Sequence, residues 1–258
     1  MTPDELAAYR RDGYLVRRAV LAPEEVASLR AAAEDVVARL VARATGEGER
    51  QADGHRFESV GDVHVQWEWR EGSQEVRLVE PVAELDERLA ALWRDERLAG
   101  PAADALGAPD VGPFTSKMNL KRAAEGSEFP WHQDLPYWWC AVGADAFDTV
   151  TAMVLLDDAT AGNGALRVLP GSHGAPAPRD PADPKGLLAD PAAVDASAEV
   201  VLEVPAGSVV WFGPLLLHRS SPNRSGGDRR AVLLTWQPAG RVRYTDVPFV
   251  GERVAELP

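Results

Sequence analysis

The stretch Phe129-Pro130-Trp131-His132-Gln133-Asp134 decides the fold, because it is the first segment that combines strand-forming residues with metal-binding ones. In a β-strand, successive side chains point to opposite faces, so residues two apart share a face. His132 and Asp134 are therefore expected to point toward the same place. They would supply two ligands of the two-histidine, one-carboxylate facial triad, which holds non-haem iron(II) and leaves coordination positions open.

The missing histidine ligand must come from the other four histidines, since the chain has five. His218 is favoured because it follows the apolar run 209–217, close to the last expected strands. His55 falls in a segment expected to be mobile, and His64 lies before the strand-rich region. His173 belongs to the turn Leu169-Pro170-Gly171-Ser172-His173, where a structural role is expected.

Two adjacent arginines, Arg229 and Arg230, begin the apolar strand that follows His218. A buried guanidinium is a rigid fork that binds a carboxylate through two hydrogen bonds. A dicarboxylate that chelates a metal at one end needs such a group at its other end. Because neighbouring strand residues face opposite ways, only one of these two arginines can point to the metal.

From residue 111 onward, short apolar or alternating runs recur between glycine, proline, asparagine and aspartate residues. Many short strands separated by turns are typical of a barrel or a double-sheet jelly roll. We expect this β-barrel core to extend over residues 111–240, within a single domain of residues 1–258. The expected strands cover residues 115–121, 129–134, 149–156, 165–169, 200–204, 208–212 and 230–237.

The first 110 residues are expected to be a mainly helical support for the barrel. Thr2 and Pro3 are typical of the cap and first position of a helix, and helical spacing of apolar residues predicts a longer helix from Pro23. Two further helices are expected at 82–93 and 94–106, the second interrupted at Gly100-Pro101. Strands are expected at 14–20 and 63–69. Residues 44–61 and 176–195 are expected to be loops of the kind that can act as lids.

Composition restricts the possible partners and location. The 258 residues are 45% hydrophobic and 26% charged, as in ordinary globular proteins, and carry a net charge of −13. This acidity argues against nucleic acid and anionic membranes as partners, because both require clustered lysine and arginine. Cys140 is the only cysteine, and the N-terminus is polar, so we expect a reducing, cytoplasmic location. No sequence feature indicates an oligomeric state.

Four segments, in order along the chain, resemble the phytanoyl-CoA dioxygenase family. They are Tyr9–Val16 with Pro23–Val26, Trp131–Asp134, Asn163–His173 and His218–Arg230. The resemblance implies a double-stranded β-helix, which is a cupin-like jelly-roll barrel, buttressed here by the N-terminal helices. It also implies an oxygenase that requires iron(II), and that takes 2-oxoglutarate and dioxygen as co-substrates.

The same resemblance assigns roles to particular residues. His132, Asp134 and His218 would be the catalytic metal ligands. Arg229, eleven residues after His218, would bind the distal carboxylate of 2-oxoglutarate, with Ser220 as a second donor. Further candidates for 2-oxoglutarate binding lie on the two strands nearest the site in sequence, with Asn119 preferred: Lys117, Asn119, Lys121 and Thr151.

The expected reaction is hydroxylation of an unactivated C–H bond in a small or medium-sized metabolite, coupled to conversion of 2-oxoglutarate to succinate and carbon dioxide. Asp134 favours this reaction over halogenation, because related halogenases lack the carboxylate ligand. Desaturation, epoxidation and cyclisation use the same ligands and remain alternatives, as does a non-catalytic barrel that binds a small molecule. Several aromatic residues are expected either to line the substrate pocket or to pack in the core: Trp67, Trp69, Trp131, Tyr137, Trp138 and Trp139.

Overall fold

Two antiparallel sheets form the centre of the molecule in the computed structural model, which describes residues 1–46, 48–50, 55–70 and 73–247. The larger sheet has the strand order β1-β11-β8-β13-β6-β5-β4-β3-β2, and the smaller has the order β10-β9-β12-β7. The larger sheet comprises β1 (Tyr14–Arg17), β2 (Glu49–Arg50), β3 (Arg56–Val60), β4 (Val63–Trp67), β5 (Val76–Glu80), β6 (Val111–Lys121), β8 (Val150–Leu155), β11 (Val209–Phe212) and β13 (Arg229–Pro238). The smaller comprises β7 (Phe129–His132), β9 (Leu166–Val168), β10 (Val200–Val201) and β12 (His218–Ser220).

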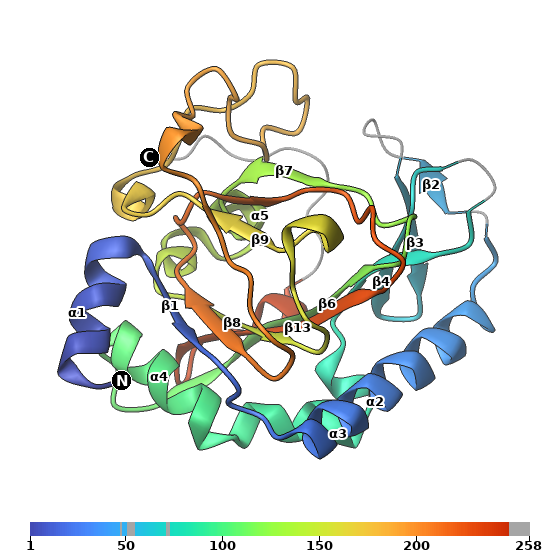
Figure 1. The fold of residues 1–258 in the computed structure, drawn as a ribbon, viewed down its shortest axis with the longest axis horizontal. Helices are drawn as coiled ribbons and strands as arrows, with labels where there is room; N and C mark the ends of the chain where they lie inside the picture. The colour runs from blue at the N-terminus through green and yellow to red at the C-terminus, as the bar shows by residue number, and fades with distance from the viewer. Residues whose placement is uncertain (47, 51–54, 71–72, 248–258) are drawn as a thin grey trace.

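The larger sheet is flanked on its outer side by α1 (Pro3–Asp12), α2 (Pro23–Val41), α3 (Glu87–Ala90) and α4 (Glu96–Leu106). A further helix, α5 (Leu135–Val142), follows β7 of the smaller sheet. In Figure 1, α2, α3 and α4 run along the lower border of the molecule, and α5 lies near β7. This arrangement confirms the predicted mainly β jelly roll with flanking helices. Within the described ranges, no helix is both long enough and apolar enough to cross a membrane.

Alternation along the strands builds two separate cores. On the outer face, Met118, Val154 and Val232 pack with Leu29 and Val36 of α2. The residues that alternate with them on the same strands, among them Met153, Leu155 and Ala231, face the inside of the barrel and pack with residues of the smaller sheet. Because period-two alternation decides which side chain faces inward, it also decides which side chains can reach a site inside the barrel.

The two N-terminal helices form as their sequences predict. Thr2 caps α1, because its hydroxyl accepts a hydrogen bond from the Glu5 amide at 3.2 Å. The Glu5 carboxylate in turn accepts from the Thr2 amide at 2.7 Å, completing a capping box. In α2, all but one of the residues expected at helical spacing are buried against the sheet: Val26, Leu29, Ala33, Val36 and Leu40. The exception, Val37, is only partly buried.

Several predicted boundaries are wrong. Residues 44–61 are not simply a loop, because the paired strands β2 and β3 both fall there, although residues 47 and 51–54 lie outside the described residues. Residues 82–93 form short 3₁₀ segments and a single α-helical turn. The predicted interruption at Pro101 does not occur, since α4 continues through it and buries the proline ring. Pro101 lies in the middle of the eleven-residue helix, where the missing N–H removes one backbone hydrogen bond at a cost that tertiary packing can offset.

The N-terminal 110 residues also contribute strands. β1 pairs with β11 and β5 pairs with β6, so strands from both ends of the chain share one sheet. β5 was not predicted, because its sequence Val-Arg-Leu-Val-Glu contains charged residues that resembled the start of a helical region. The assignment of the whole chain to one domain stays a prediction.

Candidate active site

His132 and His218 face each other across the smaller sheet. They are paired in the register of β7 and β12, and their ring centroids lie 4.1 Å apart. With Asp134 they form a buried group in which one ligand atom from each residue lies within 4.8 Å of the others. The structure thus brings together all three side chains that the sequence proposed as metal ligands.

Asp134 reaches this position by a different route from the one predicted. β7 ends at His132, and Asp134 has helical backbone angles (φ −74°, ψ −27°) at the start of α5. His132 and Asp134 therefore do not share a strand face. Pro136 lies in the first turn of α5, where a missing N–H costs no hydrogen bond, so the sequence after Asp134 suits a helix start. The helix was missed because its aromatic sequence resembled a strand.

Both histidines are oriented for metal binding by the backbone. His132 Nδ1 lies 2.7 Å from the Pro130 carbonyl oxygen, and His218 Nδ1 lies 2.9 Å from that of Leu216. A carbonyl oxygen only accepts, so each Nδ1 must carry the proton and donate. This fixes the tautomer and leaves both Nε2 lone pairs available, as in many metal-ligating histidines. Burial and the neighbouring His218 hold the pKa of His132 well below its usual range, which keeps the imidazole neutral.

Arg229 is buried inside the barrel with most of its hydrogen-bonding capacity unused. Its Nη2 donates to the Gly164 carbonyl at 3.0 Å, while Nε and Nη1 have no partner among the described residues. Burial lowers the pKa of Arg229 to about 10. A buried guanidinium without a counter-ion lowers the stability of the fold, so its presence here indicates that it binds an anionic ligand. Gly164 (φ +81°) is required here, since a Cβ would lie 2.4 Å from the Ser221 carbonyl oxygen.

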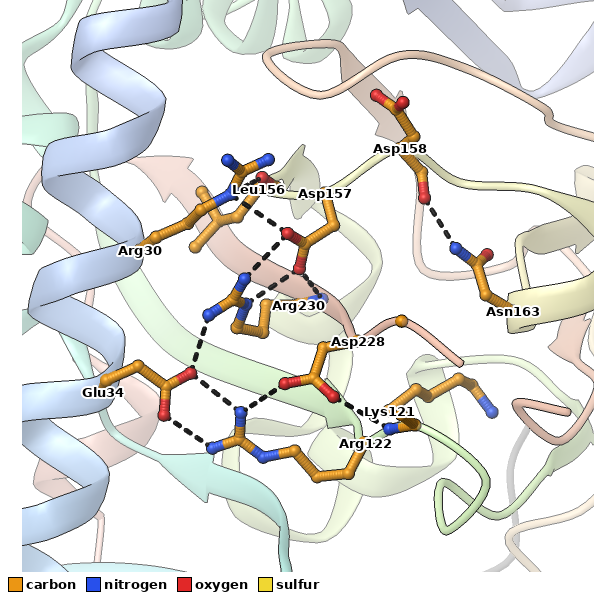
Figure 2. A network of polar contacts seen from close by, with 12 residues as sticks. Arg30, Glu34, Lys121, Arg122, Leu156, Asp157, Asp158, Asn163, Asp228 and Arg230 are labelled. Atoms are coloured by element: carbon orange, nitrogen blue, oxygen red, sulfur yellow. Dashed lines mark hydrogen bonds and ion pairs between the residues drawn. The ribbon is translucent and has the colours of Figure 1, made fainter. Parts of the chain in front are cut away.

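Arg230 points the opposite way and is paired on the outer face (Figure 2). Its guanidinium donates twice to Asp157, at 2.8 Å each, and once to Glu34 of α2, also at 2.8 Å. Strand alternation alone allowed either arginine to face inward, and the family resemblance favoured Arg229. In the structure Arg229 is the one that is buried on the inner side.

Of the other predicted co-substrate residues, some line the cavity and others do not. Ser220, Asn119 and Lys117 line the same cavity as the three metal-ligand candidates, and Asn119 Oδ1 is buried without a partner among the described residues. Lys121 is opposite Arg229 in the register of β6 and β13, but its ammonium donates to the carbonyls of Ser127 and Ser221. Burial and the Arg229 charge lower the pKa of Lys121 to about 6.

Thr151 faces the interior but is engaged elsewhere. Its hydroxyl lies 2.8 Å from that of Thr235, and the described lining of the cavity does not include it. We therefore leave Thr151 out of the co-substrate site. His173 likewise has a structural role: its Nε2 lies 3.1 Å from the Arg10 carbonyl at the end of α1.

The cavity has a volume of about 1050 Å³ and continues well beyond the three ligand candidates. Its polar wall includes Gln66, Arg77 and Ser127, with Arg77 donating to both of the others at 2.6 and 2.9 Å. Arg77 was missed because β5 was missed, whereas Gln66 and Ser127 reach the cavity through contacts between segments distant in sequence. His55, predicted to lie in a mobile loop, is buried and contacts Ser127 at 3.0 Å.

The segment 176–195 forms another wall of the cavity. Leu188 makes an isolated bridge with His132, and the Ala189 amide donates to the Trp131 carbonyl at 2.9 Å. Several of its residues line the cavity, including Asp183 and Lys185. Its function as a lid stays a prediction.

The aromatic residues of the motif divide between the cavity and the core. Tyr137 lines the cavity, with its ring centroid 5.9 Å from that of His132. Trp138 is buried against Phe114 at 5.2 Å, and Trp139 packs on Phe147 at 5.8 Å. Of the aromatic residues on α5, Tyr137 therefore lines the pocket, whereas Trp138 and Trp139 pack against other aromatic side chains.

Fold and site together define a class of protein: a double-stranded β-helix with two histidines and a carboxylate converging beside a buried arginine. These donors fit iron(II), which favours imidazole and carboxylate ligands with open positions. Arg229, with two unpartnered nitrogens, fits a carboxylate.

Comparison with known proteins identifies the family. A model of the phytanoyl-CoA dioxygenase (PhyH) family matches residues 9–231, and the chain belongs to this family. L-proline trans-4-hydroxylase from Streptomyces griseoviridis is 34% identical over 197 residues, covering 69% of this chain and 71% of that protein. Ectoine dioxygenase from Bordetella parapertussis is 31% identical over 251 residues, covering 92% and 75%. The crystal structure of EctD from S. alaskensis with bound Fe is 25% identical, with a TM-score of 0.69, covering 99% and 87%.

Proposed function

We propose that the protein is an iron(II)- and 2-oxoglutarate-dependent dioxygenase that hydroxylates a small metabolite. The observation that carries this proposal is the buried convergence of His132, Asp134 and His218, with both histidines fixed in the tautomer that presents Nε2. The named relatives, a proline hydroxylase and an ectoine dioxygenase, support the reaction class and the small size of the substrate.

His132, Asp134 and His218 would hold the iron. Arg229 would bind the distal carboxylate of 2-oxoglutarate through the two nitrogens that are otherwise without partners, and Ser220 would donate to the same group. Asn119 lines the same cavity, and its Oδ1 has no partner among the described residues. Rotation of the amide by 180° would place its NH₂ group at this position, where it could donate to the co-substrate. With iron, 2-oxoglutarate and dioxygen bound, the centre supplies oxidative decarboxylation coupled to insertion of one oxygen atom into a C–H bond.

The protein positions the substrate and excludes water around this centre. The segment 176–195 and helix α5 cover two sides of the cavity, and the Phe212 ring lies 5.0 Å from that of His218. Phe212 and Met153 also line the cavity, so its wall combines apolar side chains with polar and charged ones. We further propose a reducing, cytoplasmic location, which the lone Cys140 supports.

The proposal is tested by adding iron(II) and then 2-oxoglutarate to the protein without oxygen. Chelation of iron by the keto acid gives a weak metal-to-ligand charge-transfer absorption in the visible range, and we expect this band to appear. Absence of the band in folded protein contradicts the proposal.

Two alanine variants make the test specific. We expect His132→Ala to lose the band, because it removes a ligand. His173→Ala serves as the matched control and should keep the band, because His173 only contacts the Arg10 carbonyl at the end of α1. The reverse result would show that the wrong histidine has been assigned to the metal.

A further inference from the structure

Lys117 and Glu80 form an ion pair inside the cavity, four residues along β6 from the position opposite Arg229. Lys117 Nζ lies 3.8 Å from Glu80 Oε2, and both side chains are only about one-sixth exposed (15% and 16%). Both residues line the cavity together with His132 and Asp134. Charged side chains buried to this degree are usually paired or bound to a ligand, so the geometry of the pair is informative.

The pair is incomplete as a salt bridge. At 3.8 Å the two groups attract each other but do not form a hydrogen bond, and no described residue accepts one from the Lys117 ammonium. Glu80 Oε1 accepts a hydrogen bond from the Thr115 hydroxyl at 2.6 Å, which fixes the carboxylate in place. The ammonium thus retains three donors and Glu80 Oε2 retains acceptor capacity, both within one cavity.

Aromatic rings hold the ammonium near the metal-ligand candidates. Lys117 Nζ lies 5.7 Å from the ring centroid of Tyr137 and 5.3 Å from that of Trp138. Tyr137 also makes an edge contact with His132. The positive charge of Lys117 contributes to lowering the pKa of His132. The ammonium is therefore positioned next to the reacting centre.

The strand register separates Lys117 from the proposed 2-oxoglutarate end of the site. On β6, Lys121 is opposite Arg229, whereas Lys117 is opposite Leu233. Four residues along a strand span about 13 Å. The sequence predicted Lys117 as a co-substrate residue, and this register distance from Arg229 favours a different ligand for it.

We propose that Lys117 and Glu80 are the substrate-recognition pair, and that they select a zwitterion of the amino-acid type. Lys117 binds the substrate carboxylate, and Glu80 Oε2 binds its ammonium or protonated ring nitrogen. The spacing of the two charges matches a carboxylate and an amine on adjacent atoms, with one hydrogen bond to each. This inference rests on the proposed function, because it assigns the substrate of the same site.

The experiment removes charges from the protein and from the substrate in parallel. Succinate formation above the no-substrate background is measured for L-proline, ectoine and the twenty common amino acids. The best of these is then compared with its carboxamide and its N-acetyl derivative. We expect the zwitterion to have a kcat/KM about 10- to 100-fold higher than either derivative, the size expected for one hydrogen bond to a charged group.

Variants of Lys117 and Glu80 then test which substrate charge each residue binds. Lys117→Gln should raise KM for the zwitterion by about 10- to 100-fold and abolish the preference for acid over carboxamide. Lys117→Arg should restore most of that preference, and Glu80→Gln should abolish the preference for the free amine over the N-acetyl derivative. Arg10→Gln, which removes an exposed positive charge from α1, is the matched control and should change neither preference.

The charge-transfer band with 2-oxoglutarate separates failure of this inference from failure of the proposed function. A wild-type protein that shows the band but gives no succinate response to any of the zwitterions overturns the inference and leaves the function standing. So does a Lys117→Gln variant that changes KM for 2-oxoglutarate while its acid-over-carboxamide preference is retained. Loss of the band in the folded wild type contradicts the function itself.

Discussion

Arg229 and Arg230 are neighbours on one strand, yet they face opposite sides of the sheet and have opposite environments. Arg230, on the outer face, donates to Asp157 and Glu34 in the network of Figure 2. Arg229, on the inner face, is buried with a single carbonyl acceptor, and two of its nitrogens have no partner in the part of the chain that the structure describes. The comparison shows that the partners of a buried charge distinguish a structural role from a binding role, where residue type and position in sequence do not.

The largest expected effect comes from Arg229→Met. Removal of the only buried guanidinium facing the cavity from β13 should weaken 2-oxoglutarate binding by about 100-fold or more, because charge-assisted pairs of this kind are worth about 2–5 kcal/mol. The melting temperature of the protein without cofactors should stay the same or rise, because an unpaired charge has been removed. Titration of the charge-transfer band and thermal denaturation measure the two effects. A large drop in melting temperature with unchanged affinity would assign Arg229 a structural role.

Arg230→Met should give the reverse pattern. It leaves Asp157 and Glu34 without their shared partner, so we expect a loss of about 2 kcal/mol in the free energy of unfolding, with unchanged affinity for 2-oxoglutarate. Burial raises the pKa of Asp157, but hydrogen bonds from Arg230 outweigh it and the net pKa is lowered. The stabilisation is therefore present above the ordinary aspartate pKa and is lost as pH falls through the lowered value. Urea denaturation at neutral and acidic pH should show the two proteins converging at the acidic end.

A smaller effect is expected from Lys121, which lies opposite Arg229 on the inner face of the sheet. Its pKa of about 6 in the folded protein means that Lys121 is mostly neutral at pH 8, whereas the unfolded chain keeps the proton up to about 10.5. A carboxylate bound beside Arg229 favours the charged form, so 2-oxoglutarate binding should take up as much as one proton at pH 8, and affinity should fall as pH rises. Anaerobic calorimetry in buffers of different ionisation enthalpy measures the uptake. Lys121→Met should abolish it, and equal uptake in both proteins would assign the proton to another group.

Ser220→Ala should have the smallest effect. The hydroxyl is one neutral donor beside a charged one, so we expect the KM for 2-oxoglutarate to rise about 3- to 10-fold, or roughly 1 kcal/mol. Ser225→Ala, in the loop before β13, is the control, because its hydroxyl is bonded to Asn223 within the loop. An equal change in both variants would indicate a general disturbance of this loop.

The site residues that could be predicted from the sequence are those that lie in recognisable motifs. His218 and Arg229 could be assigned because they are tied to a segment with a recognisable pattern, and β12 and β13 place them as expected. Asp134 was correctly predicted to lie beside His132, but it was assigned to a strand, whereas the structure places it at the N-terminus of α5. Its neighbours favour a strand by residue type, and only Pro136 in the first turn of α5 indicates the helix that the structure contains.

The polar wall of the cavity could not be predicted, because its signal is not local. Arg77 and Gln66 lie on adjacent strands, and Ser127 follows β6, so their contact depends on the register of three distant segments. His55 shows the same limit, since a polar, glycine-containing sequence does not indicate burial beside Ser127. The network in Figure 2 is equally non-local, joining α2 to the ends of β8 and β13.

Helix α5 begins at the candidate carboxylate ligand and carries the rings that contact Lys117 one turn later. The Tyr137 amide donates to the Asp134 carbonyl at 3.1 Å, so the backbone of one helical turn joins the two residues directly. We therefore expect a substitution at Tyr137 that enlarges the pocket for a bulkier substrate to affect the position of Asp134 as well. An engineered change in substrate range should accordingly be assayed for its effect on metal retention.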